Sequence, residues 1–214
     1  MSFAVKKLLI QPLRVGVKKD LMKIIVFENI FDKIPLNTEH ISVWFRPDST
    51  LSKGNKPFYI PEFSNDFSAQ IFLAVKISKL GKNIGINFAD RYYSEFAFAI
   101  CLKANDLAKT AQGQNWAISF DGATAISNFF EIKDIDFQQI AVEFYYNDEI
   151  YITNNFENFI NKINQTIVYA SKFCTLKMGD LLLLKSNFDT KNIKIGDTMS
   201  IFFNKNKILE QKIK

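Results

Sequence analysis

The residues of this chain that could do chemistry are few and widely spaced. The two cysteines, Cys101 and Cys174, lie far apart and form no CxxC pair, so the sequence predicts neither a zinc site nor a disulfide framework. Cys101 could be a nucleophile only beside a general base, and no motif places the single histidine, His40, next to it. Asp66 and Asp121 stand in the turn-like contexts SND and FDG, where aspartate commonly caps its own backbone.

Short strand-like runs must position these residues. The longest covers residues 69–77, where Gln70 and Phe72 fall on the same face because side chains alternate along a strand. Residues 96–102 are apolar on both faces, which is typical of a buried strand, and this run contains Cys101. Further strands are expected at residues 23–27, 41–46, 56–61, 181–184, 198–203 and 208–213.

Two longer patterns complete the expected architecture. Residues 139–146 and 149–153 predict a hairpin across Asn147-Asp148, because both turn residues tolerate positive φ. One long helix is predicted over residues 156–172, where the apolar side chains fall on a single stripe. Shorter helices are expected around residues 88–93 and 105–110. The sequence therefore predicts an α+β, mostly β, domain.

The composition is that of a folded chain with a mild positive charge. Of its 214 residues, 48% are hydrophobic and 23% charged, which excludes wholesale disorder. No apolar run approaches the ~18 residues of a membrane span, so no membrane association is expected. The 27 basic residues exceed the 22 acidic ones by five, but the charges are spread out. A nucleic-acid surface at the basic ends is the alternative to solvated tails, and it is not favoured. With so few cysteines, the cytoplasm is the expected compartment.

Residues 1–21 are interpreted as a basic N-terminal extension, and residues 22–214 as a single domain. The extension holds one acidic residue, Asp20. It does not resemble a signal peptide, because its apolar run at residues 8–10 is short and no small-residue cleavage site follows.

Four motifs occur in order along the chain. RPDSTL stands at residues 46–51, PEFSNDFSAQIFLAVKI begins at residue 61 and is followed by ADRYYSEF, WAISFDGA stands at residues 116–123, and TLKMGDLLLL at residues 175–184. In this order and spacing they resemble the fumarylacetoacetate hydrolase superfamily. The resemblance implies that family's mixed β-roll or β-sandwich, usually a homodimer. It also implies Mg²⁺ or Mn²⁺ held by two Glu and one Asp, because such cations prefer hard oxygen ligands.

The resemblance places changed residues at all three metal-ligand positions. The two family Glu fall at Gln70 and Phe72, and the family Asp falls at Cys101. A phenyl ring cannot coordinate a metal, an amide offers a weak neutral carbonyl, and a thiol is a soft ligand that suits Mg²⁺ poorly. We therefore expect the family's Mg²⁺ or Mn²⁺ to be lost and assign no metal ligand.

The catalytic positions implied by the resemblance are changed as well. The family's Lys before FDGA falls at Ile118, and Lys103 replaces a Thr of the family's Asp motif. Asp66, Asp106 and Asp121 keep the family's residue. We therefore assign no catalytic residue, and expect a vestigial cavity bordered by Gln70, Phe72, Cys101, Lys103, Asp106, Ile118 and Asp121.

Two functional hypotheses follow. The first is a pseudoenzyme of the superfamily that acts by binding, either as a homodimer or as a heterodimer with a paralogue, or by holding a small anionic ligand. The alternative is a hydrolase, isomerase or decarboxylase that acts on a 2-oxo or β-diketo acid without metal, through Asp106, Asp121 and Lys103. A cavity filled by side chains would argue against the enzyme, and an open polar cavity that gathers those three residues would favour it.

Overall fold

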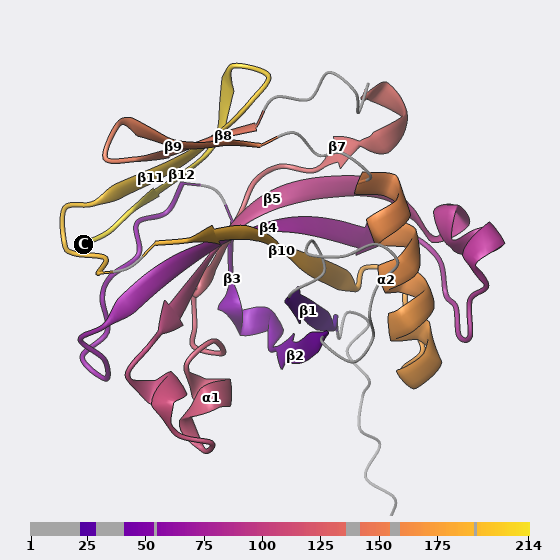
Figure 1. Cartoon of the computed structure of the whole chain (residues 1–214), viewed down its shortest axis with the longest axis horizontal. Coiled ribbons are helices and arrows are strands. Elements are labelled where there is room, and N and C mark those ends of the chain that lie inside the picture. The colour runs from indigo at the N-terminus through magenta and orange to yellow at the C-terminus, as the bar shows by residue number, and fades with distance from the viewer. Residues whose placement is uncertain (1–21, 29–40, 54, 136–141, 155–158, 191) are drawn as a thin grey trace, which may run out of the picture.

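The computed structural model describes residues 22–28, 41–53, 55–135, 142–154, 159–190 and 192–214. Figure 1 shows two β-sheets with a few helices, as the sequence predicts. An eight-stranded sheet has the order β2-β1-β10-β4-β5-β6-β3, and β7 pairs with β5. Its strands are β1 (Ile24–Glu28), β2 (Ser42–Arg46), β3 (Leu51–Lys53), β4 (Phe67–Ile77), β5 (Tyr93–Ala104), β6 (Thr124–Ile126), β7 (Phe130–Glu131) and β10 (Leu181–Asp189).

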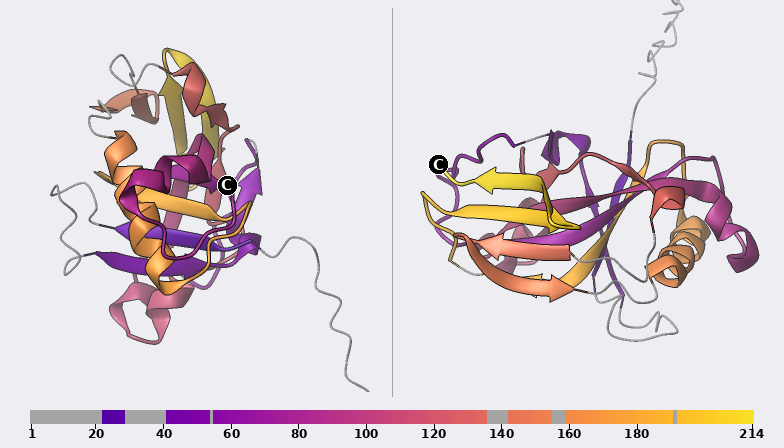
Figure 2. Two further views of the ribbon diagram at one scale, coloured as in Figure 1. Left: turned by 90° about the vertical axis from the view of Figure 1, so that its right-hand side faces the viewer. Right: turned by 90° about the horizontal axis from the view of Figure 1, so that it is seen from above.

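The second sheet has four strands in the order β12-β11-β8-β9. They are β8 (Val142–Tyr146), β9 (Glu149–Asn154), β11 (Thr198–Phe203) and β12 (Asn206–Lys212). The helices are α1 (Gly113–Trp116), α2 (Phe159–Phe173) and the 3₁₀ turns η1 (Asp48–Thr50), η2 (Ile86–Tyr92), η3 (Leu107–Lys109) and η4 (Ile132–Asp134). Figures 1 and 2 show α2 at the end of the molecule opposite to the chain's C-terminus.

The eight-stranded sheet curls into a roll. In the strand order β2 and β6 are separated by β1, β10, β4 and β5, yet the guanidinium of Arg46 on β2 donates to the hydroxyl of Thr124 on β6 at 3.0 Å. A flat sheet with strands about 4.8 Å apart could not bring these residues together. The inner face of this sheet therefore surrounds an interior, and η1 and β3 close the roll where β3 pairs with β6.

Side-chain alternation gives the sheet two apolar faces. Inside the roll, side chains including Phe72, Ala74 and Ala99 form one buried cluster with Ile24 and Leu183. The residues between them point outwards and pack against the four-stranded sheet and α2 in a larger cluster. Since both faces of β4 and β5 are covered, these central strands are almost uninterruptedly apolar, which is the pattern from which they were predicted.

Most predicted elements are confirmed. The hairpin of β8 and β9 turns at Asn147 and Asp148, whose φ values are 51° and 66°. The long helix is present as α2, and its expected first turn at residues 156–158 lies outside the described residues. The strand predicted at residues 56–61 is wrong, because only an isolated bridge from Phe58 to Ile213 forms there. Prolines at both ends of that run lack the N–H that a ladder needs.

Candidate functional site

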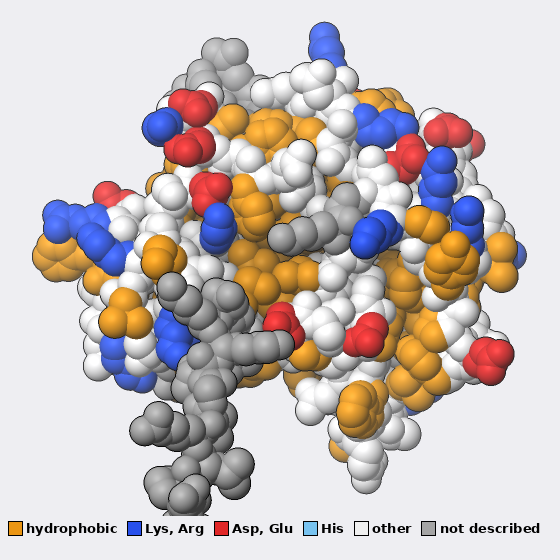
Figure 3. All heavy atoms as spheres, turned by 180° about the vertical axis from the view of Figure 1, so that it is seen from behind, with side chains coloured by type: hydrophobic (Ala, Val, Ile, Leu, Met, Phe, Trp, Pro, Cys, Tyr) orange, Lys and Arg blue, Asp and Glu red, His pale blue; other side chains and the backbone are white. Residues whose placement is uncertain are grey.

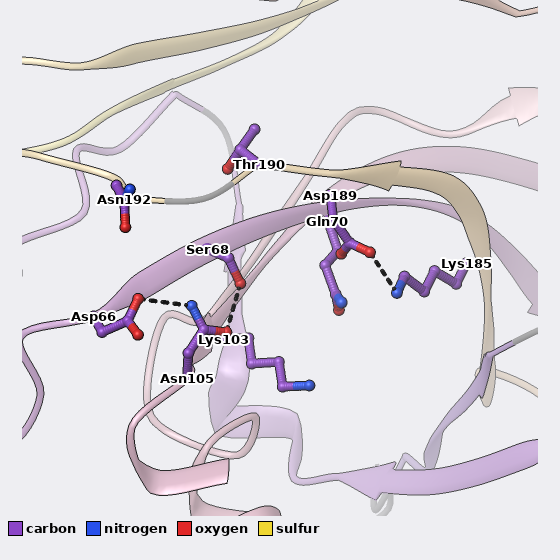
Figure 4. A pocket seen from close by; sticks show the side chains of 9 residues that line it. All are labelled: Asp66, Ser68, Gln70, Lys103, Asn105, Lys185, Asp189, Thr190 and Asn192. Atoms are coloured by element: carbon purple, nitrogen blue, oxygen red, sulfur yellow. Dashed lines mark hydrogen bonds and ion pairs between the residues drawn. The ribbon is translucent and has the colours of Figure 1, made fainter. Parts of the chain in front are cut away.

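A pocket of about 420 Å³ opens at one end of the roll, which we name the mouth pocket (Figure 4). Its lining comes from β4 and the residue that precedes it, from β5 and the residue that follows it, and from β10 and residues that follow it. The lining residues are Asp66, Ser68, Gln70, Lys103, Asn105, Lys185, Asp189, Thr190 and Asn192. This set is entirely polar or charged, in contrast to the apolar interior of the roll.

Strand register brings the central residues of the mouth pocket together. Gln70 on β4 stands opposite Cys101 on β5 and opposite Asp189 on β10. Cys101 in turn stands opposite Thr124 on β6. An irregularity in β10 between Lys185 and Asp189 shifts the register there. Such bulges re-aim side chains next to functional sites.

The acidic groups of the mouth pocket already have partners. The Lys185 ammonium pairs with the Asp189 carboxylate at 2.9 Å. Asn105 donates from Nδ2 to Asp66 Oδ1 at 2.9 Å, and the Ser68 hydroxyl donates to Asn105 Oδ1 at 2.9 Å.

Lys103 differs from these groups. Within the described part of the chain its ammonium makes no ion pair and no hydrogen bond. In Figure 4 the Lys103 side chain and the Gln70 amide extend into the same space, and Lys185 extends towards it from β10. Among the described residues, the pocket therefore presents the unpaired ammonium of Lys103 beside that of Lys185, which the Asp189 carboxylate holds.

A buried guanidinium lies close to this pocket. Arg46 is only 3% exposed, and its one hydrogen bond among the described residues goes to Thr124 at 3.0 Å. Its Nε and the Oε1 of Gln70 are both buried without a hydrogen-bond partner. Burial lowers the pKa of Arg46, and the nearby Cys101 and Glu28 oppose that change. Burial in turn raises the pKa of the Cys101 thiol, which Arg46 and Thr124 oppose. Cys101 is therefore a buried thiol, not an exposed nucleophile.

The structure brings together only part of the expected vestigial cavity. Gln70 and Lys103 line the mouth pocket, and Cys101 lies beneath it. Phe72 is fully buried in the roll, and Ile118 is buried next to α1, outside the pocket lining. Phe72 belongs to the buried apolar cluster inside the roll, whereas Gln70 and Lys103 line the open space at its mouth.

Of the three retained aspartates, Asp66 lines the mouth pocket, whereas Asp106 and Asp121 do not. Asp106 accepts hydrogen bonds from the Ser64 hydroxyl at 2.5 Å and from the Leu107 N–H at 2.9 Å, and it caps η3. Asp121 is an exposed residue in the turn before Gly122, whose φ is +72°. The site therefore does not have the Asp106, Asp121 and Lys103 grouping that the enzyme hypothesis requires.

Several residues of the site were missed from the sequence, among them Lys185 and Asp189, which line the pocket, and Arg46, which lies buried nearby. Two of these three had a signal: Arg46 is the first residue of RPDSTL, and Lys185 follows TLKMGDLLLL. Neither motif reveals that β2 curls over to β6, or that β10 carries a bulge.

The donor atoms of the site do not fit Mg²⁺ or Mn²⁺. Among the described residues no three His, Cys, Asp or Glu side chains come together as a group that could hold a metal. Asp66 and Asp189, the carboxylates of the mouth pocket, are each bound to a protein donor, and two lysines line the same space. A divalent cation there would face positive charge and lack the oxygen ligands that it prefers.

Comparisons with known proteins agree with this architecture. A family profile described as fumarylacetoacetate (FAA) hydrolase C-terminal matches residues 26–213. The chain belongs to the fumarylacetoacetate hydrolase family. A family protein from Yersinia pestis CO92 has a solved structure that superposes with a TM-score of 0.77 at 24% identity, over 91% of this chain and 93% of that one. A fumarylpyruvate hydrolase from Pseudomonas aeruginosa, solved with Mn²⁺ and pyruvate, gives a TM-score of 0.75 at 14% identity, over 90% and 88% of the two chains.

Several relatives of this chain carry enzymatic names. A mitochondrial oxaloacetate decarboxylase of Dictyostelium discoideum is 26% identical over 164 residues, which cover 73% of this chain and 74% of the relative. Oxaloacetate tautomerase YcgM of Escherichia coli is 25% identical over 167 residues, which cover 75% and 76%. Among the described residues of this family member, no helix is both long and apolar enough to cross a membrane.

Proposed function

We propose that this member of the fumarylacetoacetate hydrolase family binds a small carboxylate of the 2-oxo acid class in the mouth pocket without a divalent cation. In this proposal the chain is a pseudoenzyme that has kept the family's binding region and lost its metal-dependent chemistry. The ligand class is suggested by the relatives, whose names refer to oxaloacetate, and by the solved relative that holds pyruvate. The identities are low, so the residues of the pocket must carry the argument.

The observation that carries the proposal is the free ammonium of Lys103. It lines the mouth pocket without an ion pair among the described residues. Lys185 stands across the pocket and is held by a single partner, Asp189, whose side chain is 46% exposed. Exposed pairs of this kind contribute little stability, so an incoming carboxylate can replace Asp189 at small cost. A charge-assisted hydrogen bond to a carboxylate is worth about 1.5–3 kcal/mol.

The positive charge of the site also explains how an anion could be held where the donors do not suit a metal. Lys103 lines the pocket without a carboxylate partner among the described residues, and the buried Arg46 nearby adds a positive charge that Glu28 offsets in part. Arg46 lies in a water-poor environment, where its field is screened less than at the surface. A guest carboxylate would balance this excess.

Calorimetric titration tests the proposal directly. The protein is titrated with oxalate and with malonate, first in EDTA and then with Mg²⁺ or Mn²⁺. We expect binding in EDTA that the metals do not strengthen, and a loss of roughly tenfold or more in affinity in Lys103→Ala. Lys109→Ala is the matched control, because Lys109 is exposed on η3 and does not line the pocket. Affinity that appears only with metal would overturn the metal-free site.

The enzyme alternative is separated by an activity measurement on the same samples. Conversion between the keto and enol forms of oxaloacetate, and loss of CO₂ from it, are followed by ultraviolet absorbance and by NMR. We expect both rates to equal those in buffer. If either rate in EDTA exceeds the rate in buffer, the pseudoenzyme hypothesis is wrong and the protein is a metal-independent enzyme.

The quaternary structure is part of the same proposal. We propose a homodimer, or a heterodimer with a paralogue, as the assembled form. Light scattering of the purified chain across a range of concentrations gives its molar mass. A monomeric mass at every concentration would rule out the homodimer.

A further inference from the structure

An apolar groove lies on the face of β1 and β2 opposite to the roll interior. It has a volume of about 300 Å³ and is lined by side chains of β1, β2 and the C-terminal end of α2. Ile25 and Phe27 of β1 point into it, whereas their neighbours Ile24 and Val26 point into the roll. This groove is separate from the mouth pocket and shares no lining residue with it.

The groove exposes large apolar side chains. Phe45 on β2 is 56% exposed and Phe173 at the end of α2 is 70% exposed. Its wall is completed by Tyr169 and by the half-buried Cys174. Exposed apolar surface that is gathered in one groove, unlike single scattered residues, marks a site where something binds. Figure 3 shows the face seen from behind, where hydrophobic side chains form broad areas with acidic and basic side chains among them.

We propose that residues 8–17 of this same chain dock in the groove and cover it. The first reason is where the chain enters the fold. Residue 22 leads directly into β1, and Ile25 of β1 is paired with Phe45 of β2. The N-terminal segment is therefore tethered at the Phe45 end of the groove.

The second reason is the sequence of this segment, LLIQPLRVGV. Leu13, Val15 and Val17 alternate with Arg14 and Gly16, which gives one apolar face in an extended conformation. At about 3.3 Å per residue, five extended residues span roughly 17 Å. The groove runs only from the Ile25–Phe45 pair to the Phe27–Val43 pair, two residues along β1, so the segment is long enough once the chain has turned.

The third reason is the free edge of β2. In the described sheet β2 pairs with β1 alone, so its outer edge has unpaired backbone groups that an extended segment can use. The tether itself also favours this occupant over a second copy. A short flexible connection gives an effective concentration of order mM, which exceeds the μM concentration at which a purified protein meets its own copies.

Residues 1–21 precede the part of the chain that the family profile matches, which begins at residue 26. The docked segment would therefore be a feature of this chain beyond the shared domain. The inference concerns a different surface from the proposed carboxylate site and does not depend on it.

Thiol labelling in the full-length chain tests the inference, because Cys174 lies in the groove while Cys101 is fully buried. We expect Cys174 to react with an aromatic disulfide reagent at least tenfold faster in Leu13→Asp/Val15→Asp than in the native chain. Arg14→Asp is the control, because it changes the charge by the same two units on the face opposite to Leu13 and Val15 and should leave the rate unchanged. Phe45→Ser on the groove side should raise the rate in the native background but not further in the double variant.

Three outcomes would overturn the inference. The first is an equal labelling rate in the native chain and the double variant. The second is a labelling rate of Cys174 that falls as the protein concentration rises, together with a molar mass twice that of one chain. A second copy would then cover the groove. The third is additive effects of Phe45→Ser and the double variant, because a segment and a surface that touch must show coupling. None of these outcomes bears on oxalate binding in the mouth pocket.

Discussion

The two ends of β10 each hold a Lys–Asp ion pair, and the two pairs are built differently. At the first end, the Asp180 carboxylate accepts from the Lys23 ammonium at 2.5 Å and from the N–H groups of Lys23 and Lys177 at 2.9 and 2.7 Å, and its side chain is 1% exposed. At the second end, Asp189 holds only Lys185, and its side chain is 46% exposed.

We interpret the Lys23–Asp180 pair as part of the structural framework and the Lys185–Asp189 pair as part of the ligand site. Asp180 ties the parallel strands β1 and β10 together where they begin, and every one of its contacts is a protein contact. Asp189 follows the irregularity in β10 and faces the mouth pocket, where Lys185 can exchange one carboxylate for another. The fold is held at the end that is fully partnered, and the open end is left for a ligand.

Replacing each aspartate in turn tests this comparison, and Asp180→Ala is expected to have the largest effect on the free energy of unfolding. Asp180→Ala leaves two partly buried N–H groups and the Lys23 ammonium without their carboxylate, so the free energy of unfolding should fall by about 3 kcal/mol. Asp189→Ala breaks an exposed pair and should change it by less than about 1 kcal/mol. Urea denaturation of both variants measures the two values. Similar losses would mean that both pairs belong to the framework.

Replacing Arg46 is expected to raise the free energy of unfolding instead of lowering it. Its guanidinium is buried with no ion pair among the described residues, which costs folding energy. Arg46→Met keeps most of the volume and removes the charge, so we expect the free energy of unfolding to rise by about 1–2 kcal/mol while the affinity for oxalate in EDTA falls.

The matched control for Arg46 is Thr124→Val. It removes the hydroxyl that accepts from Arg46 and leaves the charge in place, so it should lower stability. If Arg46→Met also lowers stability, the guanidinium is compensated within the fold, and the excess positive charge that we assign to the site is absent.

The sequence predicts the frame of this protein far better than its site. The two-residue alternation along residues 69–77 and the apolar run at 96–102 identify β4 and β5, because covering both faces of a central strand demands apolar side chains. Gln70 and Lys103 were predicted to border a cavity from the resemblance to the family's motifs, and both line the mouth pocket.

What could not be predicted depends on contacts distant in sequence. The approach of Arg46 to Thr124 spans 78 residues and results from the curl of the whole sheet. The position of Lys185 and Asp189 depends on a bulge that no local pattern signals. Asp106 was assigned to the cavity from its motif, whereas in the fold its carboxylate is bound to Ser64 and to backbone N–H groups.

The smallest expected effect concerns Asp106, on the rim beside the mouth pocket. The Ser64 hydroxyl, followed by the N–H groups of Asn65 and Leu107, holds the pKa of Asp106 below its usual value. A carboxyl whose pKa is lowered by folding stabilises the fold above its unfolded pKa of about 3.9, and that contribution is lost as the pH falls through the folded pKa. Ser64→Ala should therefore cost about 1 kcal/mol or less at pH 7, and the difference should shrink below about pH 4.

Urea denaturation at several pH values, together with an NMR titration of the Asp106 carboxyl carbon, measures both quantities. The pKa of Asp106 should be higher in Ser64→Ala than in the native chain, while Ser49→Ala, an exposed serine on η1, should leave it unchanged. Oxalate affinity should stay the same in Ser64→Ala, because Asp106 does not line the mouth pocket. A loss of oxalate affinity in Ser64→Ala would show that Ser64 and Asp106 contribute to ligand binding. The separation between structural residues and ligand-binding residues that we draw along β10 would then not hold at this end of the sheet.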